Sequence, residues 1–290
     1  MRWKEILFPL GRIVLAVVLV GGSVAVAEVL VKSLEGVLSL DGAVPAIYYI
    51  AYLIVGVLVA YFAYRAYVRF VEKRAATELS GERAPKELGI GMLVGFGLVS
   101  VCIGLLWLLG DYRVTGIGAW TTVFVLLANN GAGAFVEEVL LRGVVFRISE
   151  EKLGTWIALA ISAVLFALLH LASANATVTS VIVVGLEGGI LLSAAYVMTR
   201  RLWLAIGIHF AWDFAQDYVF GVGHGVAGLV HGQITGPALL SGGSAGIEGS
   251  SLALILCLIV SAYLLARAAR KGNTVKPPWG RGGETVHVAS

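Results

Sequence analysis

The sequence predicts an all-α membrane protein, a polytopic bundle of about eight transmembrane helices. Of its 290 residues, 59% are apolar and only 13% are charged, and the mean hydropathy is +0.91. A soluble domain carries roughly a quarter charged residues, so most of this surface is expected to face lipid or other helices. No basic segment is interleaved with aromatic residues, which argues against nucleic acid as a partner.

Eight apolar runs are long enough to cross the hydrocarbon core, which takes about 20 helical residues. They lie near 7–31, 45–68, 89–110, 117–146, 154–174, 178–198, 202–220 and 249–268. The first run is long enough to span and is predicted to be an uncleaved anchor rather than a signal peptide. The fourth run is too long for one straight crossing, and a bend or re-entrant piece is expected at Asn129-Asn130-Gly131.

The basic residues predict the orientation of the chain in the membrane. Most of the 21 Lys and Arg residues fall at the N-terminus, in alternate loops and after the last run, so both termini are expected in the cytoplasm. Residues 1–270 are predicted to form one membrane-embedded domain, whose motif-bearing core covers about 117–268. Residues 271–290, rich in proline and glycine, are predicted to form a disordered cytoplasmic tail.

Two adjacent carboxylates stand in the fourth run. An ionisable group at the bilayer centre costs at least a few kcal/mol, so it indicates function. Glu138 and Arg142 are four residues apart and are expected to pair on one helix face. Glu137 is rotated by about 100° from Glu138 and has no local partner, which leaves its carboxylate available for chemistry.

Two histidines follow on later runs. His170 shares a helix face with Phe166, and His209 shares one with Asp213, because each pair is four residues apart. A single histidine on an apolar face is usually a packing residue, but six such polar groups on three runs indicate a site.

Other polar or reactive residues inside the runs receive structural interpretations. Glu28 and Glu187 are predicted to hydrogen bond between helices. Cys102 and Cys257 lie in apolar runs and are predicted to be buried free thiols.

A carboxylate, two histidines and a second acid suit the activation of water in an intramembrane catalytic cavity. A carboxylate can take a proton from water, and a histidine can donate to the oxyanion formed when water attacks an amide. The same ligand types fit Zn²⁺ with one open position, held by Glu137, His170, His209 and Asp213. A short-spaced histidine pair is missing, so a metal-free site without cofactor is favoured and Zn²⁺ is the alternative.

The ordered set Glu137-Glu138-x-x-x-Arg142, Phe166-x-x-x-His170 and His209-x-x-x-Asp213 resembles the motifs of the CPBP intramembrane proteases. This family contains CAAX prenyl endopeptidases and prokaryotic relatives, and the resemblance extends over about 117–268. It implies that Glu137 activates water with His170, that His209 and Asp213 hold the oxyanion or orient the site, and that Glu138 and Arg142 support it. Eukaryotic members have asparagine where this chain has Asp213, so an oxyanion role for Asp213 is in question.

The sequence therefore predicts an intramembrane endopeptidase in a prokaryotic cell membrane. Its partners would be membrane lipids and a membrane-anchored or lipidated peptide, with prenylated CAAX-type proteins as one class, cleaved near the C-terminus. Two alternatives stay open: a catalytically inactive immunity or scaffold relative, and a proton-coupled carrier that relays protons through the same groups.

Overall fold

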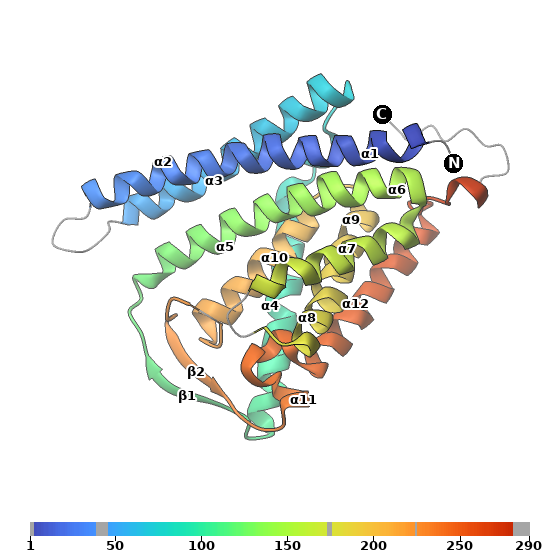
Figure 1. The fold of residues 1–290 in the computed structure, drawn as a ribbon. Coiled ribbons are helices and arrows are strands. Elements are labelled where there is room, and N and C mark those ends of the chain that lie inside the picture. The colour runs from blue at the N-terminus through green and yellow to red at the C-terminus, as the bar shows by residue number, and fades with distance from the viewer. Residues whose placement is uncertain (1–2, 39–45, 173–175, 224, 281–290) are drawn as a thin grey trace.

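A computed structural model describes residues 3–38, 46–172, 176–223 and 225–280 of the chain. It is a mostly helical bundle (Figure 1). Its longer helices are α1 (Trp3–Ala16), α2 (Gly22–Leu38), α3 (Ala46–Tyr67), α4 (Ala84–Leu108), α5 (Thr122–Glu138), α7 (Thr155–Leu169), α9 (Ile190–Thr199), α10 (Trp203–Phe214) and α12 (Ser251–Arg270). Shorter helices are α6 (Arg147–Leu153), α8 (Val178–Val184) and α11 (Ala238–Ser241).

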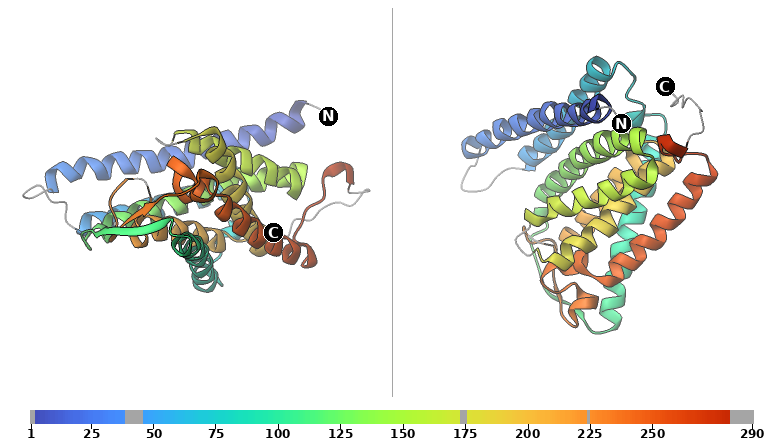
Figure 2. Two further views of the ribbon diagram at one scale, coloured as in Figure 1. Left: turned by 90° about the horizontal axis from the view of Figure 1, so that it is seen from below. Right: turned by 45° about the vertical axis from the view of Figure 1, so that its right-hand side comes forward.

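Several helices join end to end through π-helical turns. Such turns connect α1 to α2 over Val17–Gly21, α5 to α6 over Val139–Phe146, and α8 to α9 over Gly185–Gly189. The α1–α2 rod lies at the outside of the bundle (Figure 2). Gly21 lies beside Leu140, and Arg12 pairs with Glu151, so this rod runs antiparallel to α5 and α6.

Seven of the eight predicted spans are helices of sufficient length and apolarity within the described residues. The prediction of a polytopic membrane bundle is confirmed, and the count is corrected. The run at 202–220 forms α10 and a π-helical turn, Ala215–Val219. This helix is shorter than the others because the backbone turns at Gly221, whose φ of 60° suits glycine.

The fourth span is not broken where the sequence predicted a bend. Helix α5 continues through Asn129-Asn130-Gly131, so the expectation of a re-entrant piece is wrong. Asparagine can break a helix by bonding to its own backbone. Here the Asn130 side chain instead donates to Asp217 Oδ2 at 2.9 Å, which leaves the helical ladder intact.

A two-stranded sheet departs from the all-α prediction. Strand β1 (Tyr112–Ile117) pairs antiparallel with β2 (Val230–Ile234), with a bulge between Val114 and Gly116. The Thr115 hydroxyl donates to His231 O at 3.0 Å. The sheet lies at the end of the bundle near α11 (Figure 1). Its strands come from segments more than a hundred residues apart, so local sequence patterns could not pair them.

Glycines allow two pairs of helices to approach closely. A Cβ added at Gly91 of α4 would lie 2.9 Å from Gly207 Cα of α10, and one at Gly189 would lie 2.6 Å from Ala163 Cα of α7. Real Cβ atoms do not approach so closely, so only glycine fits at these crossings. The two crossings fix the positions of α10 and α7, which carry His209 and Phe166.

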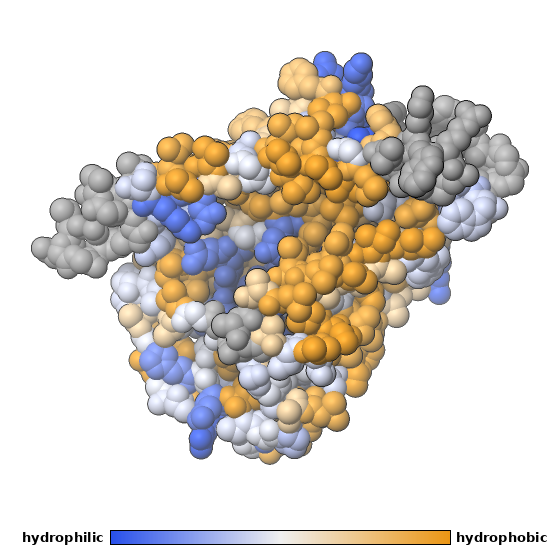
Figure 3. Space-filling model, in the orientation of Figure 1, coloured by the Kyte–Doolittle hydropathy of each residue, from blue (hydrophilic) through white to orange (hydrophobic). Residues whose placement is uncertain are grey.

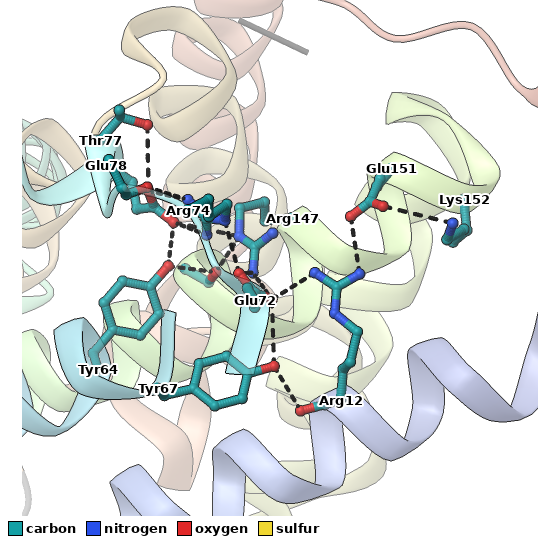
Figure 4. Close-up of polar contacts among 12 residues, drawn as sticks. Arg12, Tyr64, Tyr67, Glu72, Arg74, Thr77, Glu78, Arg147, Glu151 and Lys152 are labelled. Carbon is teal, nitrogen blue, oxygen red and sulfur yellow. Dashed lines mark hydrogen bonds and ion pairs between the residues drawn. The ribbon is translucent and has the colours of Figure 1, made fainter. Parts of the chain in front are cut away.

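An ionic cluster ties the chain together at the end of the bundle that holds most of the basic residues, here called the basic end. Glu72 pairs with Arg12 of α1, with Arg147 of α6 and with Arg74, two residues further along the chain (Figure 4). Arg74 also pairs with Glu78 at 2.6 Å. These contacts join the N-terminal rod to the rest of the bundle.

The described part of the predicted tail packs against the bundle. The Asn273 amide donates to Val197 O at 3.1 Å and Met198 O at 3.0 Å. Thr155 and Val275 exchange two hydrogen bonds of 2.9 Å and 2.8 Å. The expectation of disorder is thus not met for 271–280, whereas 281–290 lie outside the described residues.

Candidate active site

His209 lies at the centre of the polar groups that the sequence singled out. Its side chain is 9% exposed, and its Nδ1 lies 2.9 Å from Glu138 Oε1. A carboxylate only accepts hydrogen bonds, so this contact assigns a hydrogen to Nδ1. The other nitrogen, Nε2, lies 3.5 Å from Asp213 Oδ2 and 3.9 Å from Glu137 Oε2. The imidazole therefore links three carboxylates from two helices.

Glu138 and Arg142 form the expected ion pair behind His209. Arg142 Nη1 lies 2.8 Å from Glu138 Oε1, and both side chains are fully buried. The same guanidinium donates to the carbonyl oxygens of Gly188 and Gly189 at 3.1 Å and 3.3 Å. Because these carbonyls belong to the π-helical turn after α8, Arg142 joins this turn to α5, and Glu138 in turn joins α5 to His209 of α10.

Phe166 of α7 and His170, which begins the 3₁₀ turn after α7, complete the set. Their rings are 4.6 Å apart between centroids, and His170 Nδ1 lies 2.8 Å from Phe166 O. The Phe166 ring also lies 6.0 Å from the His209 ring and 5.0 Å from the Arg142 guanidinium. Phe166 thus packs between the ion pair and both histidines, which accounts for an aromatic residue in this motif.

Two cavities meet the site from different sides. The inner cavity has a volume of ≈ 40 Å³ and is lined by both histidines, Asp213, Glu187 and Glu248 among other residues. The lateral cavity has a volume of ≈ 460 Å³ and lies between α2, α3 and α5. Glu137 lines the lateral cavity, and its side chain is 43% exposed. The family resemblance implies that Glu137 and His170 act on the same water, but these two side chains line different cavities.

Figure 3 shows hydrophilic atoms gathered in a hollow beneath α2, within a mostly hydrophobic face of the molecule. The lateral cavity lies beside α2, where Glu28 and Lys32 line it together with Tyr52 of α3. Glu28 accepts from Lys32 at 2.6 Å and from the Tyr52 hydroxyl at 3.2 Å. The Tyr52 contact confirms the prediction that Glu28 hydrogen bonds between helices.

Glu187 does not match its predicted role. Its Oε2 is buried without a hydrogen-bond partner, and its side chain faces the inner cavity. The signal in the sequence was its position among Gly185, Gly188 and Gly189, which bring α7 close. Glu248 likewise lines the inner cavity, from the glycine-rich segment before α12.

The three carboxylates around the His209 imidazole have a geometry that suits acid–base chemistry. Within the described residues, no group of three or more His, Cys, Asp or Glu side chains has an arrangement that could hold a metal ion. Glu137 lines the lateral cavity, and the other three residues of the Zn²⁺ alternative line the inner cavity.

Residues 119–215 match the family model described as type II CAAX prenyl endopeptidase Rce1-like. The matched segment is similar to that family and covers about a third of the chain. This segment contains Glu137, His170, His209 and Asp213, and it begins after α4 and ends before β2. No curated protein and no solved structure is significantly similar to the chain. The family is one of proteases that act on protein substrates, and the matched segment lies within a bundle of apolar helices.

Proposed function

We propose that this protein is an intramembrane endopeptidase that hydrolyses a peptide bond near the C-terminus of a membrane-held substrate. The observation that carries the proposal is the position of Glu137. Its half-exposed carboxylate lines a large lateral cavity and lies 3.9 Å from Nε2 of the buried His209. A general base must reach both the substrate and its proton partner, and Glu137 meets this requirement.

In the proposed reaction, Glu137 takes a proton from water, and the oxygen of that water attacks the scissile carbonyl carbon. The carbon–oxygen bond forms while the carbonyl oxygen becomes an oxyanion. The oxyanion accepts a hydrogen bond from an imidazole N–H of His209 or His170. The carbon–nitrogen bond then breaks, and Glu137 returns its proton to the leaving amine, so both products leave with their protons balanced.

Three neighbours would position His209 for this reaction. Glu138 accepts from Nδ1, and Arg142 balances the charge of Glu138. Asp213 lies 3.5 Å from Nε2, where its carboxylate orients the ring. An ionised carboxylate repels an oxyanion, so we assign Asp213 to positioning rather than to oxyanion binding.

The substrate would enter from the lipid through the lateral cavity. The lining follows α5 from Asn129 to Glu137 and is mostly apolar, with small residues at Ala132 and Gly133. Eight helical residues extend over about 12 Å, enough for about three residues of an extended peptide. A membrane-anchored C-terminal segment, such as that of a prenylated CAAX-type protein, fits these dimensions.

We also infer that the basic end faces the cytoplasm, because Lys and Arg favour that side. Both termini then lie in the cytoplasm, and the lateral cavity extends from Glu137 away from the basic end. This arrangement favours entry through lipid over entry from the cytoplasmic face.

The test is cleavage of a fluorogenic farnesylated CAAX-type peptide by the purified full chain in detergent. We expect Glu137→Gln to lower kcat by about 10²–10⁴, the usual contribution of a general base. Glu28→Gln, which changes another carboxylate of the same cavity, is the matched control and should retain the wild-type kcat. Activity retained by Glu137→Gln would overturn the assignment, and activity lost to a chelator would favour the Zn²⁺ alternative.

The same assay separates the rival functions. A scaffold relative would bind the peptide without cleaving it. A carrier would move protons across a vesicle membrane in a manner that depends on Glu137 and His209 but would release no peptide product.

A further inference from the structure

The inner cavity is small and lined by both apolar and acidic side chains. Its walls include Leu191, Leu192, Ile208 and Trp212, while Glu187, Glu248 and Asp213 face it from three separate segments. A water molecule needs about 10–15 Å³ of such space. The volume of ≈ 40 Å³ therefore has room for about three waters.

Polar atoms of this cavity, and of Gln216 bonded to its lining residue Glu248, have unused hydrogen-bonding capacity. Glu187 is 3% exposed, and its Oε2 has no hydrogen-bond partner among the described residues. Gln216 Nε2 donates to Glu248 Oε1 at 3.0 Å, whereas Gln216 Oε1 is buried without a partner in the same part of the chain. Buried polar atoms are nearly always hydrogen bonded, to protein or to ordered water.

We propose that the inner cavity is a water-binding site, in which Glu187 and Glu248 retain a small cluster of water molecules. Donor and acceptor atoms lie on several sides of the space, as a bound water requires. His170 and His209 face the same space, so the cluster lies directly beside the candidate catalytic imidazole.

The second part of the inference rests on the proposed function. A hydrolase consumes one water in each turnover, and a site surrounded by apolar helices needs a supply. Gln216 lies in the turn after α10, and Glu248 lies in the 3₁₀ turn before α12. Both belong to the end of the bundle near the β1–β2 sheet, so the cluster is refilled from that end.

The two cysteines allow a direct test of the water cluster that does not depend on activity. Both are free and 1% exposed, but only Cys257 is among the residues that line the inner cavity. Hydroxyl radicals generated by X-rays from bound water oxidise side chains next to that water. With the full chain in lipid nanodiscs, we expect oxidation of Cys257 and none of Cys102.

Variants of Glu187 extend this test. In Glu187→Leu the cluster should be lost, and oxidation of Cys257 should disappear. Glu187→Gln keeps hydrogen-bonding atoms and should retain both the water and the oxidation, which also serves as a control for folding. Equal oxidation of the two cysteines in the wild type, or oxidation of Cys257 that persists in Glu187→Leu, would overturn the water site.

Kinetics then test the supply role. Glu187→Leu should lower kcat about tenfold, the effect of one lost hydrogen bond, and leave KM for the farnesylated peptide unchanged. Unchanged kcat with lost oxidation would show that the water is structural, and the supply role would fail while the endopeptidase proposal stands. No cleavage of the farnesylated peptide by the wild type would instead remove the endopeptidase assignment, and the oxidation result would still decide the water site.

Discussion

The ionic cluster at the basic end and the candidate active site contain the same residue types but satisfy them differently. Each carboxylate oxygen of Glu72 accepts from two arginines, at 2.6 Å to 2.7 Å. Glu78 accepts from Arg74 and from the Tyr64 hydroxyl. At the site, by contrast, Glu138 Oε2 and Arg142 Nε lack partners among the described residues.

This difference distinguishes polar side chains that stabilise the fold from polar side chains of the candidate site. Among the described residues, the buried side-chain atoms without hydrogen bonds are Glu138 Oε2, Arg142 Nε, Glu187 Oε2 and Gln216 Oε1, and none of them belongs to the ionic cluster. A satisfied network stabilises one arrangement, whereas unsatisfied atoms lower stability and remain able to bind water or substrate. We therefore expect the basic end to tolerate the loss of one partner better than the site does.

The largest stability effect that follows from this comparison concerns Arg142. It is the arginine paired with Glu138, so Arg142→Met leaves a fully buried carboxylate without its cation. Breaking such a pair costs about 3–5 kcal/mol. Arg147→Met should cost less, because Glu72 keeps Arg12 and Arg74. Thermal unfolding of both variants in the same detergent would measure the difference. An equal loss of stability in the two variants would contradict the distinction between the site and the ionic cluster.

The residues of the site were easier to predict than their contacts. Glu138 with Arg142, Phe166 with His170, and His209 with Asp213 are four residues apart, and helical periodicity alone places each pair on one face. The bond from His209 to Glu138 joins residues separated by 71 positions, and local sequence has no signal for it. Division of the site into two cavities likewise depends on how the helices cross.

The errors in the predicted fold have the same origin. The β1–β2 pairing and the ion pairs of Glu72 with Arg12 and Arg147 join segments that are distant in the sequence. Local sequence patterns do not predict such contacts. The bend expected at Asn129-Asn130-Gly131 failed because Asn130 found a partner, Asp217, on another helix. Glu187 was assigned to helix packing because a single acid in an apolar run does not reveal whether it faces a helix or a cavity.

Substitutions at two glycines should have effects of intermediate size, one on the stability of the fold and one on substrate binding. A Cβ at Gly189 would lie 2.6 Å from the Ala163 backbone, whereas one at Gly133 would meet no atom within 4 Å. Gly189→Leu should therefore destabilise the fold by about 1–3 kcal/mol through overpacking. Gly133→Leu should fold normally and raise KM, because its side chain fills the lateral cavity.

Unfolding temperatures and peptide cleavage would check this pair. Gly133→Leu with unchanged KM would show that the peptide does not occupy the lateral cavity. An unaltered unfolding temperature in Gly189→Leu would show that the α7 crossing can adjust.

The smallest effect is the pH dependence of the ionic cluster. Burial favours the neutral carboxyl of Glu78, but the hydrogen bond and charge of Arg74 outweigh burial and hold the pKa of Glu78 below its ordinary value of 4.5. A carboxyl whose pKa is lowered by folding adds stability above its unfolded pKa and loses that stability as the pH falls through its folded pKa. The unfolding temperature of the wild type should therefore fall as the pH is lowered below 5, by about 2–4 °C for each kcal/mol of stability that is lost. Glu78→Gln removes the titrating group, so its acid slope should be shallower, and parallel slopes for the two proteins would show that Arg74 does not stabilise the ionised form of Glu78.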